Sequence, residues 1–426
     1  MNTLRIGLVG AGFAASYHVH CLRRTYGVPV EVVGVTSLRA ASREAFAATH
    51  GLRAYESLAQ MLPAVDLVDV CSPPYAHEAQ ILEAAAAGKH LIVEKPLTGY
   101  FGPAEDPPLS EPPLLPGEGA GGEAPFLGNQ APKAPMLAAV RASLTRIRQA
   151  VAAAGVVCGY AENFVYAPAV QKEREIVAKS GAQILRMYGE ESHNGSASPV
   201  YGLWRFSGGG SLIGKGCHPL GTILYLKRVE GLARTGQPLR PVSVSARVHE
   251  ITRLPAYRDE GHLRTDYRDI EDYGQMHVTF EDGTVADVIT CELVLGGIYD
   301  FVEVFANNHR TRCRLNPNDM MEAYNPDGPA WADIYTVEKI STKEGWSPVA
   351  PDENFSMGYQ AELQDFVECA TRGAQPQSDL ALADDCTATI YAAYLSAEND
   401  GKEQEIPLAG RDSAPDMTDN ASSLVV

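Results

Sequence analysis

A glycine-rich turn near the N-terminus has the spacing of a phosphate-binding loop. Residues 10–15 read G-x-G-x-x-A, directly follow an apolar run and open a segment with helical spacing. Gly10 permits a tight turn, Gly12 lets the backbone approach a pyrophosphate, and Ala15 keeps the helix close to the strand. The first N–H groups of the helix would donate hydrogen bonds to the phosphates. The pattern predicts cofactor contacts from Gly10, Gly12, Phe13 and Ala14, and a plain glycine turn is the alternative.

The end of the second apolar run bears on which dinucleotide is bound. A ribose with a free 2′-hydroxyl is usually held by an Asp or Glu at this point. This chain has Thr36-Ser37-Leu38-Arg39 instead. A hydroxyl and a guanidinium suit a 2′-phosphate better than a carboxylate does. We therefore expect NAD or NADP, with NADP favoured by Ser37 and Arg39, and a solvated Arg39 is the alternative.

Two further apolar runs end in residues that could reach the reacting part of a dinucleotide. The carboxyl ends of parallel strands face the ligand crevice, so Ser72, Pro73 and His77 are expected to line the nicotinamide ribose. The next run ends in Glu94-Lys95-Pro96. An ammonium group at Lys95 would meet a substrate hydroxyl and stabilise the alkoxide that forms as hydride leaves. A solvated lysine at a strand end is the alternative.

These motifs and their separations resemble the Gfo/Idh/MocA family, which includes glucose–fructose oxidoreductase and inositol dehydrogenase. The resemblance rests on Gly10-x-Gly12, on Ser72-Pro73-Pro74 with His77, and on Glu94-Lys95-Pro96. The stretches 84–90 and 394–398 are also similar, so it covers nearly the whole chain. It implies that Lys95 contacts both substrate and nicotinamide, and that Glu94 and Lys95 belong to the cofactor site.

The resemblance also implies a second catalytic element, a glycine-rich helix start that carries an Asp and, four residues later, a His. Residues 208–218 match it, and His218 is retained as the implied general base. Gly214 occupies the Asp position, with Lys215 beside it. A His removes a hydroxyl proton near neutral pH only when it is hydrogen-bonded and oriented. Another residue or water must therefore orient His218, unless His218 is a buried structural residue. Lys215 could assist electrostatically or could face solvent.

Polar and aromatic residues before and after this element predict contacts with a sugar. The C–H face of a sugar stacks on aromatic rings, while its hydroxyls need hydrogen-bond partners. The candidate substrate residues are Tyr160, Asn163, Tyr166, Glu191, His193, Trp204 and Arg205. His193 lies near Glu190 and Glu191, but three such residues in one short run are insufficient to predict a metal site, and no metal is expected.

The elements that position these residues alternate regularly in the first part of the chain. Apolar runs at 4–9, 30–35, 67–71, 90–94 and 155–159 predict buried parallel strands. Helical spacing at 14–25, 40–50, 77–87 and 136–154 separates them. The alternation predicts an α/β Rossmann domain, a doubly wound parallel sheet with right-handed crossovers, over residues 1–159. The Pro- and Gly-rich residues 99–135 predict a long loop that caps the site or a neighbouring subunit, or a disordered insertion.

Residues 160–409 have the pattern of an α+β substrate domain. Runs at 184–189, 242–248, 275–280, 284–291, 299–306 and 310–315 predict a large, mainly antiparallel open sheet. Helices are expected at 167–179, 358–372 and 381–398. An open sheet face and the family resemblance favour a homodimer or homotetramer. Residues 410–426 are polar and predict a flexible tail.

The composition excludes several classes of protein. A net charge of −18 argues against a nucleic-acid surface, and no apolar run reaches the roughly 18 residues of a membrane span. The eight cysteines form no CxxC or CxxH pair, so we expect reduced thiols without zinc or disulfides. The N-terminus lacks the layout of a signal peptide, which favours a cytoplasmic protein.

The sequence as a whole predicts an NAD(P)-dependent dehydrogenase or reductase acting on a CH–OH group of a sugar, polyol or glycoside. In this hypothesis His218 takes the hydroxyl proton and Lys95 steadies the alkoxide. Two alternatives remain open. An NAD-dependent glycosidase would release product by redox and elimination without net cofactor reduction. A nucleotide-binding regulator of the same fold would show no turnover.

Overall fold

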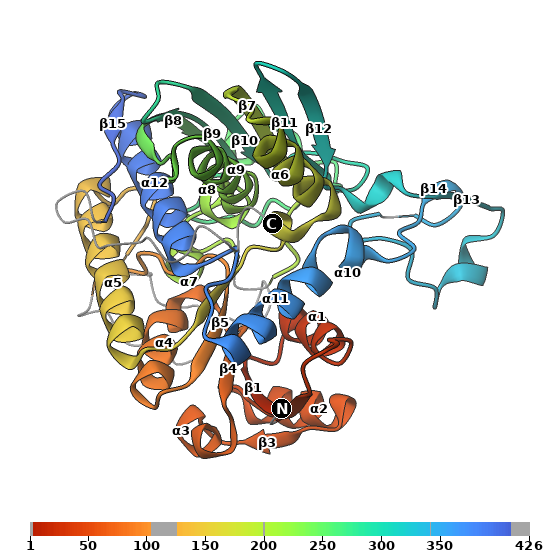
Figure 1. Cartoon of the computed structure of the whole chain (residues 1–426). Helices are drawn as coiled ribbons and strands as arrows, with labels where there is room; N and C mark the ends of the chain where they lie inside the picture. The colour runs from red at the N-terminus through yellow and green to blue at the C-terminus, as the bar shows by residue number, and fades with distance from the viewer. Residues whose placement is uncertain (1–2, 104–125, 199–200, 341, 410–426) are drawn as a thin grey trace.

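Two large sheets with their covering helices, and one two-stranded sheet, make up the described part of the chain (Figure 1). The computed structural model describes residues 3–103, 126–198, 201–340 and 342–409. Most of the expected loop at 99–135 and the expected tail at 410–426 lie outside these residues. The part of that loop that is described ends earlier than expected, because helix α5 (Lys133–Ala154) already begins at residue 133.

The first sheet confirms the predicted Rossmann fold. Its strand order is β3-β2-β1-β4-β5-β6, and the paired strands are all parallel. The strands are β1 (Leu4–Val9), β2 (Val30–Thr36), β3 (Arg53–Tyr55), β4 (Leu67–Val70), β5 (His90–Glu94) and β6 (Cys158–Ala161). The crossover helices are α1 (Phe13–Leu22), α2 (Ala40–His50), α3 (Leu58–Met61), α4 (His77–Ala86) and α5. The short edge strand β3 was not predicted, because three residues with an exposed Arg53 carry no apolar period.

The second sheet is mainly antiparallel, as expected, but contains one parallel pair. Its order is β12-β11-β7-β10-β9-β8-β15, and β7 pairs with β10 in parallel. The strands are β7 (Ile184–Ser192), β8 (Pro241–His249), β9 (Tyr273–Phe280), β10 (Val285–Cys291), β11 (Tyr299–Ala306), β12 (Arg310–Arg314) and β15 (Gln404–Glu405). Strands β9 and β10 pair antiparallel, as expected for the runs 275–280 and 284–291, and Gly283 in the turn between them adopts a φ of +79°.

Helices α6 (Pro168–Ser180), α9 (Cys217–Thr235) and α12 (Leu380–Glu398) pack against this sheet and one another (Figure 1). Helix α9 was not predicted as a long helix, because it is buried on nearly all sides and shows little amphipathic period. Helix α11 (Tyr359–Arg372) returns to pack against α1 of the first sheet. The chain's last helices therefore contact both halves of the molecule.

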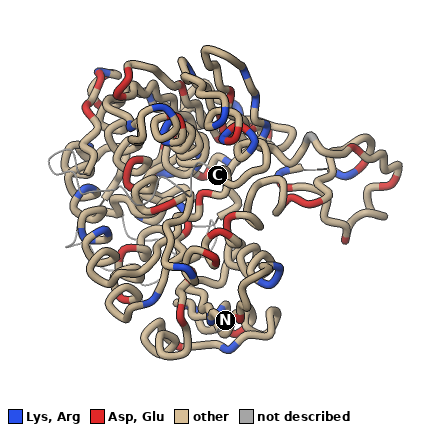
Figure 2. The backbone as a smooth tube through the Cα atoms, in the orientation of Figure 1, with Lys and Arg blue, Asp and Glu red and all other residues tan. Residues whose placement is uncertain are grey.

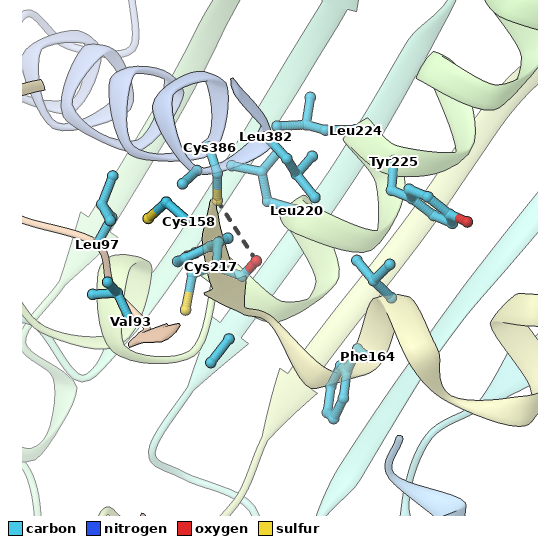
Figure 3. Packing of buried hydrophobic residues seen from close by; sticks show 14 of the residues in the cluster. Val93, Leu97, Cys158, Phe164, Cys217, Leu220, Leu224, Tyr225, Leu382 and Cys386 are labelled. Carbon is cyan, nitrogen blue, oxygen red and sulfur yellow. Dashed lines mark hydrogen bonds between the residues drawn. The ribbon is translucent and has the colours of Figure 1, made fainter. Parts of the chain in front are cut away.

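The hydrophobic core continues from one sheet to the other. In Figure 3, Leu97 and Cys158 of the first domain lie beside Cys217 of α9 and Cys386 of α12. The Cys386 thiol donates to the Cys217 carbonyl oxygen across 3.6 Å. All eight cysteines have free thiols, and Cys71 alone among them is not buried.

A two-stranded arm projects from the body of the molecule (Figure 1). Strands β13 (Glu322–Asn325) and β14 (Gly345–Pro348) pair antiparallel, and Tyr324 lies opposite Trp346. The arm was not predicted. At its root Lys339 donates to the Gly195 carbonyl oxygen across 2.9 Å, which ties the arm to the loop after β7.

Charges are spread over both halves of the chain. Figure 2 shows Lys and Arg interspersed with Asp and Glu along the described backbone. Among the described residues, no helix combines the length and apolar character needed to cross a membrane.

Candidate active site

The loop after β1 has the geometry that a pyrophosphate requires. Gly10 adopts a φ of +111°, and a Cβ there would lie 2.5 Å from the Cys71 carbonyl oxygen. A Cβ on Gly12 would meet nothing within 4 Å, so the space beside the loop is open. Gly12 caps α1 without a side-chain hydrogen bond, which leaves the N–H groups of the first helical turn available to an anion. These residues fit a bound dinucleotide.

Two arginines follow the end of β2, where the dinucleotide ribose is expected. Arg43 donates from Nη1 to the Ser37 carbonyl oxygen across 3.1 Å, and it was not singled out from the sequence. Arg39 is half-buried at the start of α2. Burial raises the pKa of the Tyr75 phenol and Arg39 opposes that shift, which places the guanidinium near the loop after β4.

The loops that end β4 and β5 are joined by His77. Its ring is fully buried, with Nε2 2.7 Å from the Ser72 carbonyl oxygen and Nδ1 3.0 Å from that of Pro96. Ser72 donates from Oγ to Gln80 Oε1 across 2.6 Å, and Pro73 begins the turn into α4. His77 therefore holds the two loops of the expected cofactor crevice together. Because both ring nitrogens are occupied, it is not expected to contact the ligand itself.

Lys95 follows β5 directly and points toward the second domain. Its Nζ donates to the Gly214 carbonyl oxygen across 3.3 Å, so it lies at the position where the family resemblance implied an Asp. Burial alone would lower the pKa of Lys95, but Cys217 and then the nearby glutamates, Glu191 first, raise it above its ordinary value. The amine is therefore an ammonium ion throughout the neutral range, which suits stabilisation of an oxyanion.

A buried ion network supports Lys95 from the Rossmann side. His18 of α1 lies with Nδ1 2.9 Å from Asp69 Oδ2 and with Nε2 3.1 Å from Glu94 Oε1. Burial opposes the imidazolium form, yet Asp69 and Cys71 hold the pKa of His18 well above its ordinary value. Sequence reasoning missed this network because its members are 51 and 25 residues apart.

Replacing His18 with asparagine is expected to destabilise the fold by about 3–5 kcal/mol, because the buried Asp69 and the largely buried Glu94 lose their shared cation. A raised folded-state pKa means that this contribution is fully present below the unfolded value of about 6.5. It is lost as the pH rises through the folded value. Urea unfolding at pH 6 and at higher pH measures the free energy of unfolding of both proteins. The difference between wild type and variant should decrease as the pH rises.

The matched control for His18 is His277→Asn. His277 pairs with Asp287 at 2.7 Å, but the two side chains are 44% and 33% exposed. Its loss should cost less than about 1 kcal/mol. Equal losses in the two variants would contradict a special role for the buried network.

His218 is held by a carboxylate that sequence reasoning did not identify. It is the second residue of α9, and its Nδ1 lies 2.6 Å from Glu162 Oε1. Glu162 follows the carboxyl end of β6, the same sheet edge that carries Lys95, and this position was the available signal. Burial, then Lys95 and Lys215, lower the pKa of His218 well below its ordinary value, so its ring is neutral at pH 7. Burial raises the pKa of Glu162.

At residue 214, where the family resemblance implied an Asp, an aromatic ring leaves no room for a side chain. A Cβ on Gly214 would lie 2.7 Å from the ring of Tyr201. Tyr201 donates from its hydroxyl to Glu292 Oε1 across 2.7 Å, and Lys215 Nζ lies 2.7 Å from the same oxygen. Lys215 is 2% exposed, so the alternative that it faces solvent is wrong.

A further carboxylate faces the second ring nitrogen of His218. Glu191 Oε2 lies 3.9 Å from His218 Nε2, and Glu191 is buried near the end of β7. Burial raises the pKa of Glu191 to about 7, although Lys95 and Lys215 oppose the shift. One region of the protein therefore contains Nε2 of His218, the ammonium group of Lys95 and the carboxyl group of Glu191.

Three of the predicted substrate residues have their side chains engaged inside the protein. Asn163 Nδ2 donates to the Met357 carbonyl oxygen across 2.7 Å. Tyr166 donates to Asp365 Oδ2 across 2.7 Å, and Tyr160 lies in the hydrophobic core at 1% exposure. The polar groups of Asn163 and Tyr166 are thereby occupied within the protein, and Tyr160 is part of the hydrophobic core.

Besides Glu191, described above, three more predicted substrate residues belong to the second part of the chain. His193 accepts a hydrogen bond at Nδ1 from the Gly195 N–H across 3.0 Å. Burial lowers its pKa well below the ordinary value, and Lys215 adds to the shift, so it lies close to the charged cluster. Trp204 is buried and donates to the Tyr100 carbonyl oxygen across 3.1 Å. Arg205 is half-buried on α7 (Trp204–Ser207), a helix that packs against the turn after β4.

Two groups of three potential metal ligands occur among the described residues, and neither contains His193. One is His18, Asp69 and Cys71; the other is Glu162, Cys217 and His218. In the first group the ring already pairs with the carboxylate. In the second, His218 is bound to Glu162, and the nearby ammonium of Lys95 disfavours another cation.

Comparisons with known proteins identify relatives of the N-terminal part of the chain. Residues 4–106 match the family model Gfo/Idh/MocA, described as an oxidoreductase family with an NAD-binding Rossmann fold. Inositol 2-dehydrogenase of Cereibacter sphaeroides is 40% identical over 97 residues, which are 22% of this chain and 29% of that enzyme. Glucose-6-phosphate 3-dehydrogenase of Bacillus subtilis is 31% identical over 93 residues, covering 22% and 26% of the two chains.

Solved structures extend the similarity to the whole fold. GenD2 from gentamicin A biosynthesis, in complex with NAD, has a TM-score of 0.72 at 21% identity, covering 95% of this chain and 97% of that one. Levoglucosan dehydrogenase with NADH and L-sorbose has a TM-score of 0.67 at 17% identity, covering 96% and 100%. The matching segment spans under a third of the length of the curated relatives. Residues 4–106 of this chain are therefore similar to the NAD-binding Rossmann part of Gfo/Idh/MocA oxidoreductases, and the solved structures show the same fold over nearly the whole chain.

Proposed function

We propose that the chain is an NAD(P)-dependent dehydrogenase that oxidises a CH–OH carbon of a sugar, polyol or glycoside, or reduces the corresponding carbonyl. The observation that carries the proposal is the meeting of Lys95 and the Glu162–His218 pair at the edge of the sheet that bears the dinucleotide loop. The sugar dehydrogenases among the relatives support the substrate class.

The protonation states of the two catalytic residues suit opposite roles. A neutral His218 accepts the hydroxyl proton at Nε2 when Nδ1–H donates to Glu162. The ammonium of Lys95 stabilises the oxygen as negative charge develops on it. A bound nicotinamide would supply the acceptor for the hydride that leaves the same carbon. Glu162 orients the ring and stabilises the imidazolium that forms, so it is a positioning residue.

The function is tested by adding sugars, polyols and glycosides to the protein with NAD or NADP and following absorbance of the reduced nicotinamide. Turnover of at least one of them supports the proposal, and none across the panel favours a regulator. Release of an aglycone without net cofactor reduction would favour the glycosidase alternative. A homo-oligomer that associates through the second sheet remains part of the proposal.

We further propose that Arg39 and Arg43 hold a 2′-phosphate, so that NADP binds more tightly than NAD. Arg39→Ala is expected to raise the Kd for NADP about tenfold and to leave that for NAD unchanged, because a charge-assisted hydrogen bond is lost in one complex only. Calorimetric titration of both cofactors measures this. Arg146→Ala, at an exposed site on α5, is the control. Equal weakening of both cofactors would contradict a phosphate contact.

A further inference from the structure

Three side chains with carboxyl groups lie on the same face of the second sheet. Glu191 of β7 lies directly opposite Asp300 of β11 and opposite Thr290 of β10. Side chains alternate along a strand, and Gly189 and Val302, two residues from Glu191 and Asp300, face α9. Glu292 lies two residues after Thr290 and contacts Lys215. All three carboxylates therefore face the start of α9, where His218 and Lys95 are located.

Each of these carboxylates keeps one buried oxygen without a hydrogen-bond partner in the protein. The atoms are Glu191 Oε2, Glu292 Oε2 and Asp300 Oδ1, and the residues are 7%, 0% and 1% exposed. Lys215 is already paired with Glu292, and Lys95 donates to a backbone carbonyl. Three carboxyl groups thus share this end of the sheet with the ammonium groups of Lys95 and Lys215. Buried acceptors without donors are costly unless a ligand supplies the donors.

We infer that the substrate is an amino sugar or aminocyclitol whose ammonium group lies between Glu191 and Asp300. This inference rests on the proposed dehydrogenase function and names its substrate class. Carboxylates directly opposite each other on neighbouring strands repel, and an intervening cation removes the repulsion. An ammonium group has three N–H donors and no acceptor, so it can donate to both unpartnered oxygens at once. A neutral hydroxyl has a single donor.

The pair also predicts a change in protonation on binding. Burial raises the pKa of Glu191 to about 7 and raises that of Asp300 well above its ordinary value, and Glu191 adds to the shift of Asp300. The empty pair therefore retains a proton near neutral pH. An ammonium ligand stabilises both carboxylates and expels that proton to the buffer, whereas a neutral sugar leaves it in place.

The test uses calorimetric titration of the protein with its oxidised cofactor bound. Glucosamine and kanosamine are compared with glucose and N-acetylglucosamine, and scyllo-inosamine with scyllo-inositol, each in two buffers of different ionisation enthalpy. At least one amine is expected to bind about 100-fold more tightly than its neutral counterpart and to release a proton. Glu191→Gln and Asp300→Asn should each abolish most of that preference.

Glu190→Gln is the matched control, because Glu190 bonds to Tyr188 and Ser192 on the opposite face of the same strand. It should keep the preference, and cofactor binding by each variant shows that it is folded. The inference is overturned if no amine binds better than its neutral counterpart, or if Glu191→Gln and Asp300→Asn leave the preference intact. Efficient oxidation of neutral sugars alone would overturn it and leave the proposed function standing. If an amine binds with the predicted preference but neither it nor any neutral sugar reduces the cofactor, the proposed function is overturned instead.

Discussion

Replacing Lys95 with methionine is expected to lower kcat by about 1,000-fold and to change the Kd for NAD by no more than a few fold. Methionine keeps most of the length of the side chain and removes the charge. Loss of one donor to an oxyanion costs on the order of 100- to 1,000-fold in rate, and a lysine ammonium held within a buried cluster is at the upper end. Steady-state oxidation of the best sugar in the panel measures the first quantity, and calorimetry measures the second.

Lys89→Met controls for the loss of a lysine from the same strand. Lys89 precedes β5 at the opposite end from Lys95, and it should keep wild-type kcat and cofactor affinity. A Lys95 variant that turns over at the wild-type rate would remove this ammonium from the mechanism. A parallel loss of cofactor affinity would show that the residue binds nucleotide and has no separate part in catalysis.

Changing Glu162 to glutamine is expected to lower kcat by about 100-fold while KM stays within about threefold. An amide can still bond to Nδ1 of His218, but it carries no charge to stabilise the imidazolium that forms when the ring takes the proton. Proton transfer should then limit the rate, so the solvent isotope effect on kcat should rise. Glu162→Asp should restore part of the rate, because the charge returns at a longer distance.

The control is a second buried Glu–His pair that lies outside the site. Glu173 of α6 is 1% exposed, and its Oε1 lies 2.8 Å from His309 Nε2. Glu173→Gln should lower thermal stability and leave kcat and the isotope effect unchanged. If both variants lose stability and neither loses kcat, Glu162 has no part in positioning the base.

The first sheet could be predicted because each of its longer strands has a recognisable pattern within a few consecutive residues. Each of its long strands is a short apolar run bounded by a turn, so period and length alone identify it. The helix α9 was not predictable as a helix from the same signals, because burial on all sides removes the amphipathic stripe. The strands of the arm could not be predicted either, because four-residue strands with exposed Tyr324 and Trp346 show no buried face.

The site was predictable only where a residue's role follows from its place on a strand end. Lys95 and the glycine loop are of this kind. Glu162 satisfied the same rule but was passed over, because its partner His218 is 56 residues away and only the fold brings the two together. Asn163 and Tyr166 were read as sugar contacts from their types alone. Their polar groups bond to Met357 and Asp365, nearly 200 residues further along the chain, which no local pattern reveals.

The uninterrupted core between the two sheets has a consequence for how a ligand arrives. Helix α11 packs on α1 and helix α12 on α5, and Cys217 of α9 and Cys386 of α12 are buried in the shared core (Figure 3). Rotating one half against the other would expose apolar surface at about 25 cal/mol for every Å². The reacting groups are therefore held in a rigid frame before any ligand binds, and little ordering entropy remains to oppose binding. Access must then depend on local shifts of loops and side chains around an otherwise stationary scaffold.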